Sequence, residues 1–264
     1  MNAMRLTSSA PSLRQHTITA PAPAWRNPDH IVLETCVEDI EGVRISARAG
    51  ADRAELCDNL TAAGTTPSIG TIEAAIFAAA EQVEQRRAQA GPYWADKADA
   101  AAPFGLRVII RPRGGSFVYD ADEGRAMIAD VRRIASLALE MAEFTRPQAT
   151  GGGRGQLPPA VDLGFVVGAL TEDGTIDRGL VRLLVDMANG APVTFHRAFD
   201  QCRDTVEAYG DLEGLGVRYV LTSGAAQTAA DGASVIAGLV ASGGPTVVAA
   251  GAVRPHGLVD LVES

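Results

Sequence analysis

The sequence predicts an α/β fold, a TIM-type (β/α) barrel that lacks its eighth strand within this chain. From residue 30 onward, short runs rich in β-branched residues alternate with longer helical patterns. About seven such units follow one another, which favours a barrel over a doubly wound sheet. A Rossmann fold would need a glycine-rich fingerprint after the first strand, and the segment CVED at 36–39 has no glycine.

Seven short runs are expected to form the strands, because each is rich in apolar and β-branched residues. In chain order they cover residues 31–37, 53–57, 106–111, 161–170, 193–197, 219–222 and 246–250. Helices between successive strands demand crossover connections. The sheet is therefore predicted to be parallel, with right-handed crossovers.

The helix boundaries are predicted from capping residues and periodicity. Ser68 is placed to cap an Ala- and Glu-rich helix that runs to about residue 90. Residues 122–144 form a long amphipathic pattern. Asp177 is expected to cap a later helix, which stops at Gly190.

The chain is expected to contain one domain, a barrel over residues 30–264. Residues 1–29 are predicted to be a disordered tail, because they are rich in Ser, Thr, Ala and Pro and lack the apolar core of a signal peptide. Two segments interrupt the alternation of strands and helices, residues 85–105 and 146–159, and each lies after a helix and before a strand. We expect both as insertions on the N-terminal face of the barrel.

The strand pattern stops one strand short of a closed barrel. It supplies seven strands and finishes in a predicted helix over residues 255–263, whereas a (β/α)₈ barrel needs an eighth strand. The run TITA at 17–20 has some β-propensity but is short for this purpose. We therefore expect an opening between the first and seventh strands, from a chain that is truncated or depends on a partner subunit. Unpaired edges favour association with another chain, a second copy included.

Composition and charge exclude several classes of partner. The net charge of −9 and a pI near 5.0 argue against nucleic acid. No run approaches the roughly 18 apolar residues of a membrane span, and no predicted helix has a Lys/Arg-rich face for a membrane surface. Three cysteines without a CxxC spacing suit a reducing compartment, so we expect a cytoplasmic protein.

Two pairs of residues with the pattern E-x-C lie on the first two predicted strands. Side chains two residues apart on a strand share a direction, so Glu34 and Cys36 point the same way, as do Glu55 and Cys57. Neighbouring strands would place both cysteines near the C-terminal mouth of the barrel. Two thiolates could chelate a soft ion such as Cu(I). The alternative is that each cysteine is only a small buried core residue.

Charged and polar residues gather at the same strand ends. Glu34, Glu55, Arg111 and His196 are predicted to converge on the mouth, a mixture that suits binding a small anion and moving a proton on it. Further candidates for ligand binding are Arg113, Arg197, Asp200, Thr222 and Ser223. The alternative is a set of salt bridges inside the barrel, since buried charges need partners.

Sequence motifs at and near the strand ends also resemble those of one protein family. In order they are LETCVED (33–39), GADRAELCDNL (50–60), TTPSIG (65–70), IRPRGGSFVY (110–119), GALTEDGTID (168–177), TFHRAFD (194–200) and LTSG (221–224). Their content and order resemble the CutC family, proteins linked by name to copper homeostasis, across roughly residues 30–254. The resemblance implies a TIM barrel. It also implies copper binding through the cysteines of these motifs, here Cys36 and Cys57.

Two hypotheses about function follow. The first is a CutC-like copper homeostasis protein that holds Cu(I) on the two cysteines. The second is a TIM-barrel enzyme that acts on a small anionic metabolite, with Glu34, Glu55, Arg111 and His196 at its centre. A third reading is a truncated, inactive relative. The first two predict different losses on mutation: thiols for the first, charged groups for the second.

Overall fold

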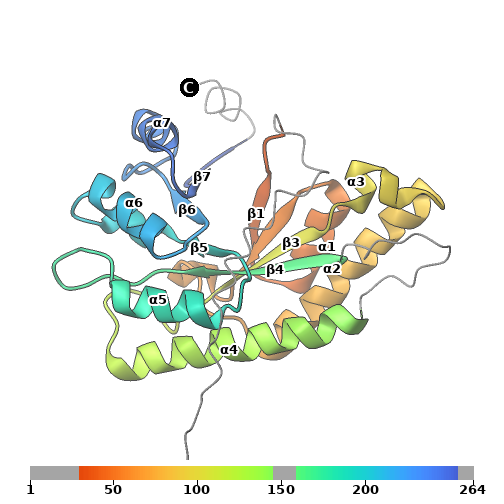
Figure 1. The fold of residues 1–264 in the computed structure, drawn as a ribbon, viewed down its shortest axis with the longest axis horizontal. Coiled ribbons are helices and arrows are strands. Elements are labelled where there is room, and N and C mark those ends of the chain that lie inside the picture. The colour runs from red at the N-terminus through yellow and green to blue at the C-terminus, as the bar shows by residue number, and fades with distance from the viewer. Residues whose placement is uncertain (1–29, 145–158, 255–264) are drawn as a thin grey trace, which may run out of the picture.

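The computed structural model describes residues 30–144 and 159–254, which form an open barrel of parallel strands surrounded by helices (Figure 1). The seven strands of this part pair strictly in chain order. Their bounds are β1 (Glu34–Val37), β2 (Arg53–Leu56), β3 (Phe104–Ile109), β4 (Val161–Val167), β5 (Val193–Phe195), β6 (Tyr219–Thr222) and β7 (Thr246–Ala249). All seven predicted strands are confirmed, within a few residues at their ends.

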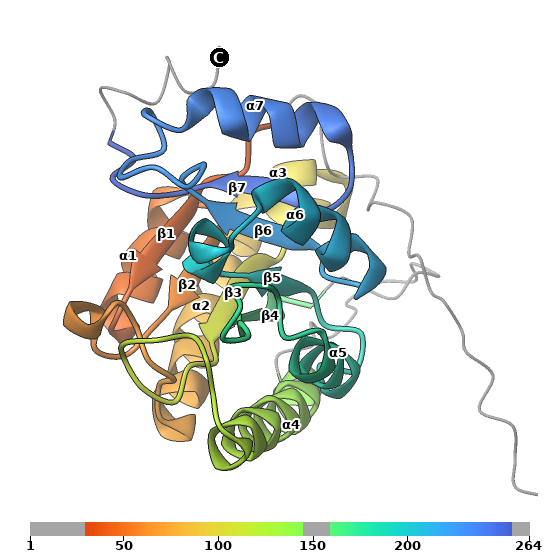
Figure 2. The ribbon, with the colours of Figure 1, turned by 90° about the vertical axis from the view of Figure 1, so that its left-hand side faces the viewer.

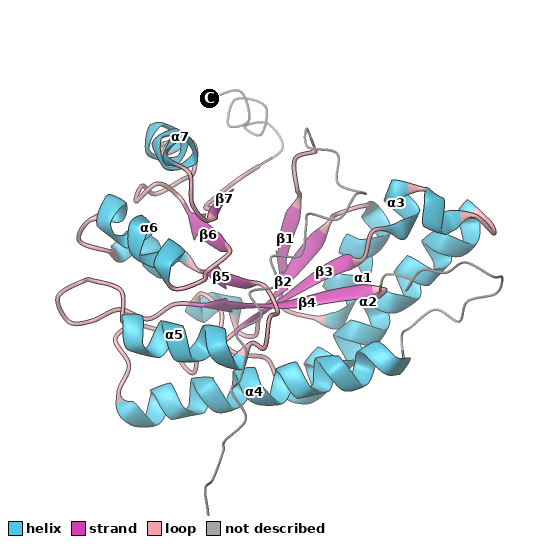
Figure 3. Cartoon of the chain, in the orientation of Figure 1, coloured by secondary structure: helices cyan, strands magenta, loops and turns pink. Residues whose placement is uncertain are grey.

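The helices lie on the outer side of the curved sheet (Figure 3). They are α1 (Ile40–Ala49), α2 (Ile69–Ala90), α3 (Ala98–Ala101), α4 (Ala121–Phe144), α5 (Arg178–Met187), α6 (Thr205–Gly214) and α7 (Ala233–Ser242). Short 3₁₀ turns form η1 (Leu60–Ala62), η2 (Trp94–Asp96) and η3 (Arg197–Gln201). None of the helices in the described ranges is long and apolar enough to cross a bilayer.

The predicted caps begin their helices. Ser68 Oγ accepts a hydrogen bond from the Thr71 amide at 3.1 Å, at the start of α2. Asp177 Oδ1 accepts from the Leu180 amide at 3.0 Å, at the start of α5. The α5 helix ends shortly before Gly190, whose φ of +87° is the left-handed conformation that glycine adopts freely.

In the described part of the chain, the barrel is open between β1 and β7. β1 and β7 stand at the two edges of the sheet and do not pair with each other within the described residues, as predicted. Figure 2 shows α1 beside β1 and α7 beside β7, at the two sides of this opening. Three predicted segments lie outside the described residues. They are the tail at 1–29, the insertion at 146–159 except for its last residue, and the helix at 255–263.

The first of the two predicted insertions, residues 85–105, is partly helical. Over residues 85–105 the α2 helix continues to Ala90, and η2 and α3 then lead into β3. This segment therefore enters the barrel at the N-terminal end of a strand, as expected. Arg87 anchors it, because its guanidinium lies 4.3 Å from the centre of the Trp94 ring and donates to the Pro159 carbonyl at 3.0 Å.

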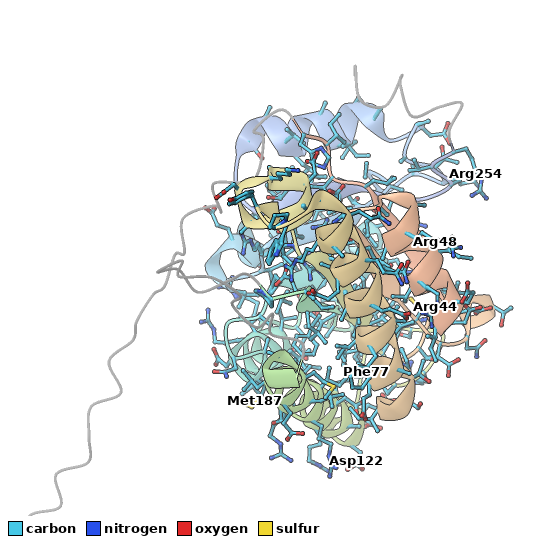
Figure 4. The ribbon with its side chains drawn as sticks, turned by 90° about the vertical axis from the view of Figure 1, so that its right-hand side faces the viewer. Arg44, Arg48, Phe77, Asp122, Met187 and Arg254 are labelled. Carbon is cyan, nitrogen blue, oxygen red and sulfur yellow. The ribbon has the colours of Figure 1, made fainter. Side chains whose placement is uncertain are left out.

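The hydrophobic core fills the space between the sheet and its helices. One cluster joins β2–β4 to α1, α2 and α4 and includes Val43, Ile72, Leu106, Met127 and Phe165. A second joins β5 and β6 to α5 and α6 and includes Val181, Phe195, Leu212 and Val220. Figure 4 shows the outer side of the helices, where Arg44 and Arg48 project from α1 and Phe77 from α2. The helices thus pack their buried faces against the sheet and hold the strand ends in position.

Candidate metal centre at the barrel mouth

A cavity of about 500 Å³ lies at the C-terminal ends of the strands. Ligand sites of barrel enzymes and binding proteins occupy this face, and the volume is within the usual range for small-molecule sites. The structure brings seven of the sequence-predicted residues to its wall, namely Cys36, Glu55, Cys57, Arg111, His196, Arg197 and Asp200.

The two cysteines lie side by side on neighbouring strands. The register of β1 and β2 sets Cys36 opposite Glu55, and Cys57 follows directly after the end of β2. The two sulfur atoms are 3.8 Å apart, and both cysteines are free thiols. One carboxylate oxygen of Glu55 joins them, because the three potential ligand atoms all lie within 4.8 Å of one another. Cys57 and Glu55 are buried, whereas Cys36 is exposed.

The electrostatics of the pair favour one thiolate. The Cys57 thiol hydrogen-bonds to Cys36 and lowers the pKa of Cys36, and burial opposes this effect. The same hydrogen bond, together with burial, raises the pKa of Cys57. The pair therefore loses its first proton readily, from Cys36, and its second with difficulty. Burial raises the pKa of Glu55 well above its ordinary range, and the charge of Cys36 adds to the shift.

Glu34 does not join this group, which corrects the sequence prediction. Glu34 shares the inward direction of Cys36 but lies two residues earlier on β1, where it forms an ion pair with Arg53 of β2. The two side chains are 8% and 4% exposed. The Arg53 guanidinium also lies 4.5 Å from the centre of the Tyr219 ring. Glu34 therefore belongs to a buried charge pair below the cavity, as in the alternative of core salt bridges.

Arg111 borders the cavity but most of its donors are engaged. Its Nη1 donates to the carbonyls of Ala62 and Gly64 at 2.7 and 2.8 Å, and its Nη2 donates to that of Gly115 at 2.9 Å. The guanidinium stacks on Phe117, 4.9 Å from the ring centre. These bonds use three of the five N–H groups, so the guanidinium can offer a ligand its charge, the Nε donor and the second N–H of Nη2.

His196 is buried at the cavity wall, and Phe117 covers it with ring centres 4.8 Å apart. Its Nδ1 accepts from the Ala198 amide at 3.1 Å, which leaves the ring proton on Nε2. Burial, aided by the charge of Arg111, lowers the pKa of His196 to about 3. A neutral imidazole with so low a pKa is a weak base, which does not favour the proton transfer that the enzyme hypothesis assigned to it.

Gly168 is a site residue that the sequence reasoning missed. It follows β4 and lies against the His196 ring: a Cβ placed on it would be 2.3 Å from Cε1 and 2.4 Å from Nδ1 of that ring. Only glycine therefore leaves room for the imidazole. The signal in the sequence was the glycine itself, at the end of a buried strand.

Four predicted residues, of which Arg197 and Asp200 lie on the cavity wall, form a hydrogen-bonded network. Asp200 accepts from Thr222 Oγ1 at 2.5 Å, from Arg197 Nε at 2.8 Å and from Ser223 Oγ at 3.0 Å. The amides of Ser223 and Ala225 also donate to it, each at 3.1 Å. Burial alone would raise the pKa of Asp200, but these hydrogen bonds outweigh it and lower the pKa. The network ties η3 to the end of β6.

Arg113 points away from the other candidates. Its Nη2 donates to Glu123 at 3.0 Å, at the start of α4, and to the carbonyl of Val118. It is not among the residues of the cavity wall. Arg111 and Arg113 flank one proline, but β3 ends at Ile109, so the alternation of a strand no longer holds there.

The Asp200 network gives a prediction with a pH dependence. Asp200→Asn should lower the free energy of unfolding by about 1–2 kcal/mol at neutral pH, because several donors lose a charged acceptor. A carboxyl whose pKa is lowered on folding stabilises the fold above its unfolded pKa of about 3.9, and this contribution is lost as the pH falls through the folded pKa. Urea unfolding of both proteins at several pH values should show the difference shrinking in acid. A difference that stays constant down to low pH would contradict the network.

Comparisons with known proteins place the chain in a family. The model of the CutC family matches residues 31–144 and 160–264. A CutC family protein of Mesorhizobium japonicum is 35% identical over 220 residues, which are 83% of this chain and 67% of that protein. The human protein named copper homeostasis protein cutC homolog is 33% identical over 234 residues, 88% of this chain and 69% of that protein.

The fold agrees with a solved structure. The crystal structure of the putative copper homeostasis protein CutC from Streptococcus agalactiae superimposes with a TM-score of 0.65 at 27% identity. The match covers 89% of this chain and 94% of that one. These matches confirm the resemblance of the sequence motifs, and the chain belongs to the CutC family.

Proposed function

We propose that this protein acts in copper homeostasis by binding Cu(I) through Cys36 and Cys57. The observation that carries the proposal is the pair of free thiols 3.8 Å apart at the barrel mouth. At that separation one ion can contact both sulfur atoms. Thiolates are soft ligands and select soft ions such as Cu(I) over hard ones. The names of the human and streptococcal relatives support copper as the ion.

The surroundings of the pair suit a loosely held ion that is passed on. Cys36 is exposed and its pKa is lowered by the hydrogen bond from Cys57, so an incoming ion first meets the thiol that ionises more easily. Cys57 is buried and must give up its proton when the ion binds. A hydrogen bond with Glu55 also lowers the pKa of Cys36, and burial, which raises the pKa of Glu55, favours the protonated carboxyl that can donate it. Two sulfur ligands do not close a tetrahedral zinc site, which needs four.

A competition titration with a colorimetric Cu(I) chelator, without oxygen and with a reductant present, tests this function. We expect one Cu(I) per chain. The double variant Cys36→Ser, Cys57→Ser should lose more than about a hundredfold in affinity, because even changes outside the ligand shell cost roughly 10–100-fold.

Cys202→Ser is the matched control. Cys202 lies after η3, its thiol hydrogen-bonds to the Ala198 carbonyl, and it is not part of the Cys36, Glu55 and Cys57 group. Its affinity for Cu(I) should equal that of the wild type. Stoichiometric copper retained by the double variant would overturn the proposal.

A further inference from the structure

We propose that the cavity at the barrel mouth is also a binding site for a small organic monocarboxylate, held by His196 and Arg111 with its apolar part against Phe117. The site is distinct in its ligands from the cysteine pair, although both border the same cavity. It does not depend on copper binding.

The first support is an unused donor on His196. The residue is 4% exposed, and within the described residues its Nε2 has no hydrogen-bond partner. Because Nδ1 already accepts from the Ala198 amide, Nε2 carries the proton and can only donate. A buried donor without an acceptor is costly, and an acceptor supplied by a ligand in the cavity removes that cost.

The second support is a positive charge without a carboxylate. Arg111 is 3% exposed and forms no ion pair within the described ranges; its Nη1 and Nη2 atoms donate to backbone carbonyls, while Nε has no hydrogen-bond partner. The other arginine of the wall, Arg197, is already neutralised by Asp200. Arg111 is therefore a guanidinium of the cavity wall that forms no ion pair with a carboxylate among the described residues, and a ligand with one negative charge could supply that partner.

The side chains of Arg111 and His196 both pack against the Phe117 ring. The centre of the Phe117 ring lies 4.9 Å from the guanidinium carbon of Arg111 and 4.8 Å from the centre of the His196 ring. A carboxylate has two oxygen atoms, and each residue has one nitrogen atom without any partner in the part of the chain that the structure describes, Nε of Arg111 and Nε2 of His196. This match favours a carboxylate over a phosphate, whose second charge and additional oxygens would remain without partners here.

The rest of the wall indicates that the acid has an apolar body. Leu60, Ile109 and Leu221 join Phe117 around the cavity. A volume of about 500 Å³ greatly exceeds that of a metal ion and suits a small organic molecule. The ligand class is therefore a compact monocarboxylic acid with an apolar chain or ring.

Phenylacetate is a suitable probe, with phenylacetamide as its neutral analogue. Both would be titrated into the full chain, freed of metal and kept reduced at neutral pH, and followed by ligand-detected NMR. We expect phenylacetate to bind one site and to exceed the amide in affinity by about tenfold, because only the acid balances the charge of Arg111. Inorganic phosphate should compete weakly.

A pair of variants locates the site. His196→Asn should weaken phenylacetate about tenfold, because Asn can still accept from the Ala198 amide but has no donor in place of Nε2. Arg113→Ala is the matched control, since Arg113 ends the same segment as Arg111 but pairs with Glu123 outside the cavity wall. Its affinity should be unchanged.

Several results would overturn the inference. They are equal binding of acid and amide, stronger binding of phosphate than of phenylacetate, or no binding of phenylacetate up to its solubility. The comparison of acid and amide needs no substitution, so it decides even if His196→Asn does not fold. Because the protein is free of metal throughout, failure here leaves the copper proposal untouched, and failure of copper binding leaves this one untouched.

Discussion

Replacing Arg53 by Met is expected to lower the free energy of unfolding by about 3–5 kcal/mol, because it strands the Glu34 carboxylate inside the barrel. Both side chains are almost fully buried, at 4% and 8% exposure, and they form an ion pair across β1 and β2. The substitution also removes the guanidinium that stacks on the Tyr219 ring. Urea denaturation followed by circular dichroism measures the loss.

The double variant Glu34→Leu, Arg53→Met separates charge from packing. Apolar residues of similar volume often replace a buried ion pair without net cost, so the double variant should recover most of the stability lost in Arg53→Met. If the two proteins are equally unstable, packing of the long Arg53 side chain, rather than the unpaired charge, would be the cause. Neither residue belongs to the group of Cys36, Glu55 and Cys57, so Cu(I) affinity in the folded double variant reports whether the Glu34–Arg53 pair acts on the site.

The ion pair shows which part of the site could be predicted from the sequence. Period-two alternation places Glu34, Cys36, Glu55 and Cys57 on the inner face, and the structure confirms that direction. Alternation says nothing about the register of two strands. The strands are staggered so that Glu34 faces Arg53 and Cys36 faces Glu55. That stagger hides Glu34 in a pair and brings the two sulfur atoms together.

Loops after the strands were harder to predict than the strands. The runs that form β1 to β7 are apolar enough to identify, because both faces of a parallel strand are buried. Beyond the strand ends, direction depends on local backbone turns. Arg111 turns inward to the carbonyls of Ala62 and Gly64, whereas Arg113 turns outward to Glu123. Local turns also direct Asp200, which follows β5 and bonds to Thr222 at the end of β6 and to Ser223 directly after it.

Gly168→Ala is expected to destabilise the protein by about 3 kcal/mol, through a clash with the His196 ring. The added methyl group would stand 2.3 Å from Cε1 of His196, far inside van der Waals contact, and the ring cannot yield easily because Phe117 packs against it. Overpacking of this kind costs roughly 1–3 kcal/mol. Displacing the ring also breaks its bond to the buried Ala198 amide, which adds about 1–3 kcal/mol.

Thermal and urea unfolding measure this loss, and two further variants decide its cause. Gly210→Ala in α6 is the matched control, because a Cβ there meets no atom within 4 Å and alanine favours a helix. It should be neutral or slightly stabilising. In Gly168→Ala, His196→Ala the ring that causes the clash is absent, so the added methyl should cost little beyond the loss in His196→Ala alone. An undiminished penalty from Gly168→Ala in that background would show that backbone conformation, and not the imidazole, requires glycine at the end of β4.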